Sequence, residues 1–148
     1  MNLKGLNLWL KHNNFDCTCE KGDNDFEYDN DDEVIFCGNL ADNCEDKFTA
    51  FAKSKGLYRS ADIRTIAFLH ELGHYNTMDG LTKKQELISL LGKKLVNGTP
   101  TPNEFIANIK YFIYYRLPVE RVATEWAIDY ANNNPADLAT LDSFMRED

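Results

Sequence analysis

The sequence is poor in several features, and each shortage argues against a class of protein. It contains no run of about 18 apolar residues, the length that a membrane-spanning helix needs, so we expect no such helix and no membrane partner. Its 16 Lys and Arg are outnumbered by 24 Asp and Glu, which gives a formal net charge of -8. Because contact with phosphates requires a basic face, this balance also argues against a nucleic-acid partner.

Cysteine is scarce as well. The four cysteines, Cys17, Cys19, Cys37 and Cys44, all lie in the first third of the chain. A secreted disulfide scaffold has a higher density and a leader, and the N-terminal residues lack the apolar stretch of a signal peptide. The cysteine spacings also differ from the C-x2-C pairs of structural zinc sites. We therefore expect a cytosolic protein with free thiols.

The remaining composition supports one folded unit. Hydrophobic residues make up 43% of the 148 residues, enough to bury a core and too many for intrinsic disorder. The sequence has no internal repeat and no Gly/Ser-rich linker. We expect residues 1–148 to form a single domain of ordinary size.

Periodicity and turn signals predict an α+β fold that is mostly helical. Apolar residues at helical spacing predict a helix over residues 2–12, and short apolar segments between turn formers predict a small antiparallel sheet over residues 15–38. The acidic stretch 23–33 lacks the Gly and Glu positions of an EF-hand loop, so it predicts solvated turns and no calcium site. Helix-start signals follow at Asn43, Ser60, Thr82 with Gln85, Thr101-Pro102, Pro118 and Asn134-Pro135.

The segment His70-Glu71-Leu72-Gly73-His74 matches the pattern H-E-x-x-H, and it uses two of the three histidines in the chain. Residues four apart lie on one helix face, so both imidazoles can bind one metal ion. Glu71 is close enough around the helix to act on a water molecule without being a ligand. The pattern predicts a Zn²⁺ site with His70 and His74 as ligands and Glu71 as general base.

A catalytic zinc site needs a third protein ligand and an open position for water. The longer pattern HExxHxxGxxH is excluded, because Thr77 and Gly80 stand where it needs Gly and His. His12 lies in an unrelated N-terminal segment, and Asp79 belongs to a predicted turn. Neither is a strong candidate for the third ligand.

A later segment, residues 118–131, carries a second pattern. It has Glu120, then Ala123, Trp126 and Ala127, at the Glu, Ala, aromatic and Ala positions of the second helix of a gluzincin. With HELGH, this arrangement resembles gluzincin-type zinc metallopeptidases, in the style of small ImmA/IrrE-like proteins and other phage- or mobile-element-encoded zincins. The resemblance covers residues 60–131.

By this resemblance Glu120 is the third zinc ligand. The family's Asp or Asn that supports a ligand histidine is replaced here by Thr124, whose hydroxyl can still accept a hydrogen bond from an imidazole N–H. A competing register of this pattern stays open, in which Glu125 is the ligand and Asp129 its supporting residue, since these two have the same i, i+4 spacing.

The function implied is hydrolysis of a protein or peptide substrate. Relatives of this style bind substrate as an added strand, for which residues 33–37 are the local candidate; a buried core strand is the alternative. Two other hypotheses remain: a catalytically silent zincin-fold binding or regulatory module, and a metal-free helical domain. The lysine pairs 83–84 and 93–94 predict a solvated helix face. Candidate donors to a reaction oxyanion are Tyr75, Tyr111, Tyr114, Tyr115 and Tyr130.

Overall fold

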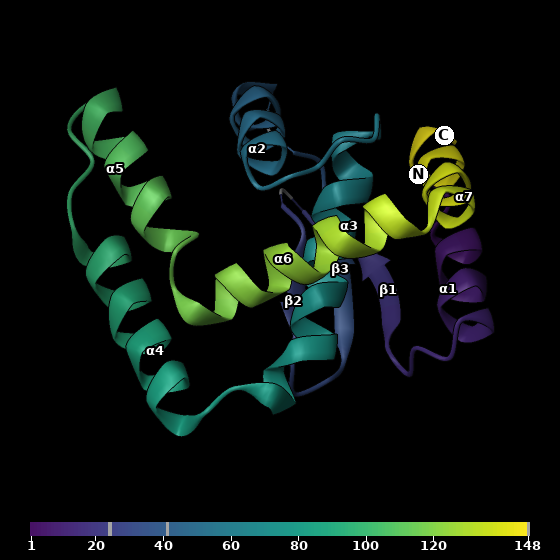
Figure 1. The fold of residues 1–148 in the computed structure, drawn as a ribbon, viewed down its shortest axis with the longest axis horizontal. Helices are drawn as coiled ribbons and strands as arrows, with labels where there is room; N and C mark the ends of the chain where they lie inside the picture. The colour runs from purple at the N-terminus through teal and green to yellow at the C-terminus, as the bar shows by residue number, and fades with distance from the viewer. Residues whose placement is uncertain (24, 41, 148) are drawn as a thin grey trace.

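The computed structural model describes residues 1–23, 25–40 and 42–147, and the side chains of residues 42–45 are not described. The cap expected at Asn43 and the thiol of Cys44 therefore lie outside the described side chains. The fold is 65% helical with a small sheet, which confirms the predicted α+β, mostly helical class. Its elements are α1 (Leu3–His12), β1 (Thr18–Lys21), β2 (Glu27–Asp29), β3 (Val34–Cys37), α2 (Asp42–Ser54), α3 (Ile63–Thr77), the 3-10 helix η1 (Met78–Gly80), α4 (Lys83–Gly98), α5 (Glu104–Tyr114), α6 (Pro118–Asn133) and α7 (Pro135–Arg146) (Figure 1).

The three strands form a mixed sheet in the order β1-β3-β2. β2 and β3 are antiparallel and are joined by an acidic turn in which Asp29 accepts hydrogen bonds from the backbone of Asp31 and Asp32. β1 pairs with β3 in parallel, so a purely antiparallel sheet was the wrong prediction for this pair. The hydrophobic pattern shows which segments are strands, but strand direction depends on the pairing of distant segments, which places β1 and β2 at opposite edges of β3.

Local side-chain chemistry sets the helix starts. Thr82 and Gln85 form the predicted capping box of α4. The cap of α3 is Asp62 and not Ser60: its carboxylate accepts the Arg64 N–H at 3.0 Å and also pairs with the Arg64 guanidinium. Asn103 caps α5 in the same way, so that helix begins later than Thr101-Pro102 suggests.

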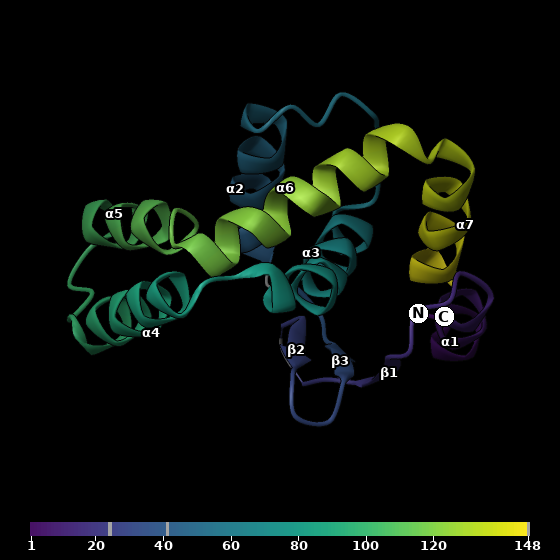
Figure 2. The same cartoon turned by 60° about the horizontal axis from the view of Figure 1, so that its bottom comes forward.

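Helix α3 runs through the centre of the molecule, with α6 crossing it and the sheet on another side (Figures 1 and 2). Nine of the ten residues from 65 to 74 are buried. The two helices approach closely at Gly73, where a Cβ atom would lie 2.5 Å from the backbone oxygen of Ala123. A glycine is therefore required here by the approach of another backbone.

Replacing Gly73 by Ala should destabilise the protein by about 1–3 kcal/mol, because the added methyl meets backbone that can give way only by moving α6. Thermal unfolding should detect this as a lower Tm. Gly98→Ala is the matched control, since a Cβ at that helical glycine meets nothing within 4 Å. An unchanged Tm for Gly73→Ala would contradict the close helix crossing.

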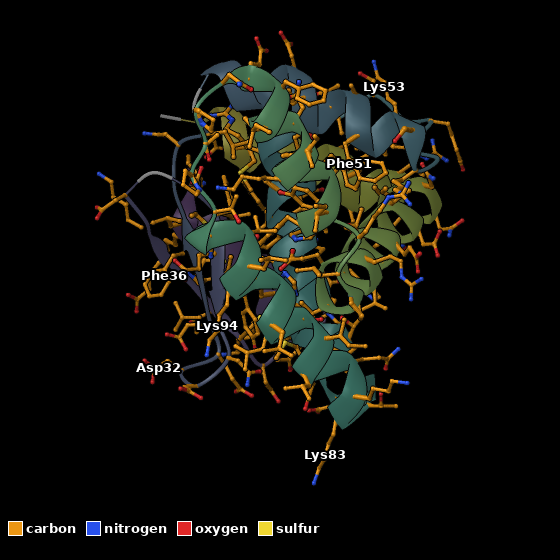
Figure 3. All side chains as sticks on the ribbon, turned by 90° about the vertical axis from the view of Figure 1, so that its left-hand side faces the viewer. Asp32, Phe36, Phe51, Lys53, Lys83 and Lys94 are labelled. Carbon is orange, nitrogen blue, oxygen red and sulfur yellow. The ribbon has the colours of Figure 1, made fainter. Side chains whose placement is uncertain are left out.

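Helices α4 and α5 form a hairpin at one end of the molecule, away from α1 and α7 (Figures 1 and 2). Figure 3 views the molecule from this end. Two contacts fix α4 to the start of α6. The Val119 N–H donates to the Ser89 hydroxyl at 3.1 Å, and the missing side chain of Gly92 leaves room for Leu117. Among the described residues, no helix is long and apolar enough to cross a membrane.

Candidate metal centre

The two histidines of the motif lie side by side on α3. His70 is 4% exposed and His74 is 8% exposed, and their ring centroids are 4.7 Å apart. The i, i+4 spacing places both rings on the same face of α3, where α6 covers them. The apolar residues upstream anchor this helix in the core, so the imidazoles are held by a rigid support.

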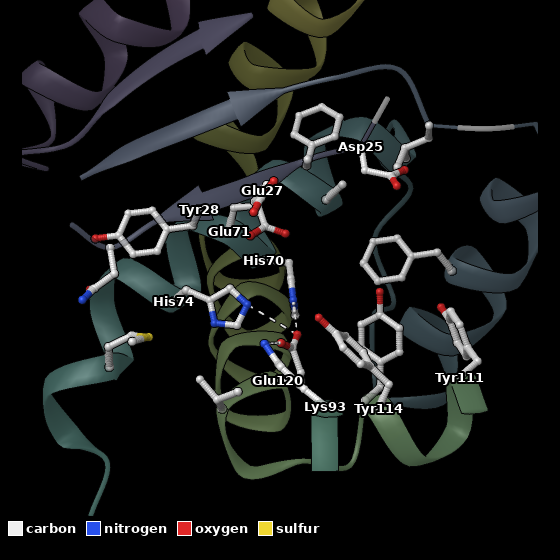
Figure 4. Close-up of a pocket in the computed structure, with 18 residues that line it drawn as sticks. Asp25, Glu27, Tyr28, His70, Glu71, His74, Lys93, Tyr111, Tyr114 and Glu120 are labelled. Carbon is white, nitrogen blue, oxygen red and sulfur yellow. Dashed lines mark hydrogen bonds and ion pairs between the residues drawn. The ribbon is translucent and has the colours of Figure 1, made fainter. Parts of the chain in front are cut away.

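Glu120 reaches this pair from the first turn of α6, as Figure 4 shows. One carboxylate oxygen, Oε2, lies 3.0 Å from Nε2 of His70 and 3.4 Å from Nε2 of His74. Although burial alone would raise the pKa of Glu120, interactions with the two histidines hold it well below its ordinary value. Glu125 and Asp129, the competing register, are both exposed to solvent.

Thr124 fixes the orientation of His70. Its hydroxyl donates to the backbone oxygen of Glu120 at 2.9 Å and lies 3.1 Å from Nδ1 of His70. Since its single proton is used on that carbonyl, the hydroxyl accepts the Nδ1–H of His70. In neutral His70 this leaves a lone pair on Nε2, which faces the carboxylate of Glu120.

Two acceptors facing each other in a buried site require a cation or a proton between them. Burial lowers the pKa of His70, which disfavours the protonated ring. Ligand atoms held tetrahedrally at 2.0–2.1 Å from a metal ion are about 3.3 Å apart. The two distances from Glu120 Oε2 to the imidazole nitrogens, 3.0 and 3.4 Å, bracket this separation. The geometry is thus compatible with a metal ion.

Glu71 belongs to the same cluster. Its carboxylate lies within 4.8 Å of ring nitrogens of both His70 and His74, and these three residues could hold a metal ion by themselves. Burial raises the pKa of Glu71 well above its ordinary value, and the negative charge of Glu120 raises it further. An interaction with the backbone of Tyr28 in β2 lowers the pKa of Glu71 and partly opposes this shift.

The cluster opens into a cavity of about 590 Å³ lined by residues of the sheet, α2, α3, α4, α5 and α6. Tyr111, Tyr114 and Tyr115 line it. The hydroxyls of Tyr75 and Tyr130 are engaged elsewhere, with the backbone of Asp16 and the side chain of Asp137, respectively. Tyr114 also interacts with Glu120, and burial raises its pKa. Of the five candidate tyrosines, three remain near the site.

Lys93 is a residue of the site that the sequence interpretation missed. Its ammonium forms an ion pair with Oε1 of Glu120 at 2.5 Å and lies 5.2 Å from the Tyr114 ring centroid (Figure 4). The Lys93-Lys94 pair was expected on a solvated helix face, which is wrong for Lys93. Lys93 follows Ser89 by four residues, so the two share a face of α4, but only the structure shows that Ser89 is buried and that this face is turned toward α6.

The remaining sequence candidates lie elsewhere. His12 and Asp79 are exposed. Cys17, Cys19 and Cys37 are buried free thiols, and among the described side chains the only cluster suited to a metal is the one at His70. β3, proposed as either a substrate-binding edge or a core strand, is the central strand of the sheet. The edge strand beside the cavity is β2.

No protein-family model, no curated protein and no solved structure matches this chain. What the molecule can do must therefore be inferred from its own residues. They form a buried histidine and carboxylate cluster that could hold a metal ion, next to a cavity and the edge of a sheet.

Proposed function

We propose that the protein is a zinc-dependent metallohydrolase, and specifically a peptidase of the gluzincin type. One observation carries the proposal. Nε2 of His70 and Nε2 of His74, which come from one helix, and Oε2 of Glu120, from another, converge at distances suited to ligands of one ion. This is the ligand set that the resemblance to ImmA/IrrE-like zincins implied.

The donor set favours zinc. Two imidazole nitrogens and one carboxylate oxygen match catalytic zinc sites, which keep a fourth position open. Magnesium and calcium prefer oxygen ligands alone. A zinc ion at such a site lowers the pKa of a water molecule to about 7 and polarises the carbonyl of the substrate.

The surrounding residues have distinct roles in this proposal. Glu71 takes the proton from the attacking water and passes it to the nitrogen of the leaving amine. Thr124 holds His70 in the tautomer that leaves Nε2 free. Lys93 and Tyr114, both at the cavity wall, carry N–H and O–H donors that can stabilise negative charge on the substrate carbonyl oxygen.

A peptide is the substrate class that the cavity suits best. β2 lines the cavity and is an edge strand, so it can pair with the backbone of an extended peptide. The acidic net charge of -8 favours a polypeptide over a nucleic acid as the partner. We place this activity in the cytosol.

Metal content tests the proposal directly. Protein purified without a metal-binding tag should contain one zinc per chain by elemental analysis, and His70→Ala should lose it. His12→Ala, the change of an exposed histidine outside the cluster, should keep it. Wild-type protein that neither contains zinc nor takes it up would overturn the proposal.

A further inference from the structure

A second cavity of about 570 Å³ adjoins the metal centre, between η1 and α4. We call it the α4 groove. Its lining is predominantly apolar, and Lys83 and Glu86 of α4 border it. The apolar residues that line it are Met78, Leu81, Leu87, Leu90 and Val119.

The α4 groove shares part of its lining with the cavity of the metal centre. Met78, Lys93 and Val119 line both cavities. Val119 directly precedes Glu120, and the ammonium of Lys93 contacts that carboxylate at 2.5 Å. The methylene stem of Lys93 can therefore border the groove while its charged end stays at the metal centre. The groove is therefore a direct neighbour of the metal centre.

The groove has a fixed wall and an uncovered apolar surface. The Ser89–Val119 hydrogen bond and the Gly92–Leu117 contact attach α4 to α6. Leu87 and Leu90 are 54% and 52% exposed, although both line the groove. A ligand side chain that covered them would gain the free energy of apolar burial.

We propose that the α4 groove receives a bulky apolar side chain of the substrate, from a residue next to the bond that is cleaved. Successive residues of an extended peptide are about 3.3–3.6 Å apart, so a neighbouring residue lies within reach of a cavity that shares its wall with the metal centre. The substrate class is a polypeptide with Leu, Met or Phe at that position. The inference rests on the proposed peptidase function.

Binding of short labelled peptides tests the groove separately from hydrolysis. The probes are fluorescent glycine-rich peptides that differ in one residue, which is Leu, Ala or Asp. The protein is the Glu71→Gln variant, loaded with zinc or kept metal-free, and fluorescence anisotropy gives the affinities. The Leu peptide should bind about 10-fold or more tightly than the Ala peptide, and the Asp peptide should bind more weakly than either.

Variants of α4 identify the surface responsible. Leu87→Ser with Leu90→Ser should reduce the preference for Leu over Ala to less than about 3-fold. The matched control is Leu91→Ser with Leu95→Ser, which changes two leucines that are 56% and 68% exposed on the same helix and do not line the groove. The control should keep the full preference. All four side chains are already half-exposed or more, so both proteins should fold.

The outcomes separate the groove from the peptidase function. Equal affinities for the Leu and Ala peptides would contradict the proposed role of the groove. An equal loss of the Leu preference in both double variants would contradict it as well. The proposed role would also be contradicted if the wild type is a dimer that dissociates when Leu87 and Leu90 are changed, because a second copy of the chain would then cover the groove. A Leu preference that depends on these two leucines supports the groove even if the zinc-loaded wild type hydrolyses no peptide, a result that overturns only the peptidase function.

Discussion

Replacing Glu71 by Gln should abolish peptide hydrolysis while leaving the zinc content unchanged. The amide keeps the size of the side chain but cannot take a proton from water. A positioned general base contributes about 10²–10⁴-fold to a rate, so turnover should fall by that factor. The measurements are hydrolysis of a quenched fluorescent peptide and elemental analysis of the same samples.

Glu27→Gln is the control for a general effect of charge. Glu27 also lines the cavity and is exposed, but it does not belong to the cluster around His70. Its replacement should change the rate little. Full hydrolysis by Glu71→Gln would contradict the role of Glu71. Stoichiometric zinc without hydrolysis in any variant, the wild type included, would instead favour the catalytically silent binding module.

The sequence was most informative where the chemistry is local. Helix starts at Thr82 and Pro118 were predicted because a cap depends on residues within one turn, and the structure has both. The start of α3 was placed too early because Ser60 and Asp62 both suit a cap. The additional pairing of Asp62 with Arg64 favours the later residue.

The direction of the strands and their position in the sheet could not be predicted from the sequence, for a different reason. The short apolar segment at residues 34–37 predicted a strand, and the structure buries Ile35 and Cys37 on one face of it. Nothing in that segment tells which strands lie on either side. The central place of β3 and the edge position of β2 follow from pairing between distant segments, which no local pattern in the sequence reveals.

The site shows the same division. His70 and His74 are related by helix geometry, so their proximity could be predicted from spacing alone. Glu120 lies 50 residues from His70, and only a family pattern suggested it. Neither helix spacing nor a family pattern pointed to Lys93. It reaches Glu120 because Ser89 and Gly92 attach α4 to the start of α6, a tertiary contact without a motif.

Variants of Glu120 and Glu125, the two candidates for the third zinc ligand, should differ strongly in zinc affinity. Glu120→Gln should weaken zinc binding by more than about 100-fold, because the site loses a charged ligand and not merely a supporting hydrogen bond. Glu125→Gln should leave the affinity unchanged, since Glu125 is exposed on α6. Competition with a chromophoric zinc chelator measures both affinities.

The comparison also controls for folding. Both variants exchange a carboxylate for an amide on the same helix, and circular dichroism can show that each keeps its helical content. If Glu125→Gln loses zinc and Glu120→Gln keeps it, the competing register is right and the short distances between Glu120 and the histidines have another cause. If both keep it, His70, Glu71 and His74 hold the ion without a residue from α6. Glu71 would then be a ligand, and its assignment as general base would fail.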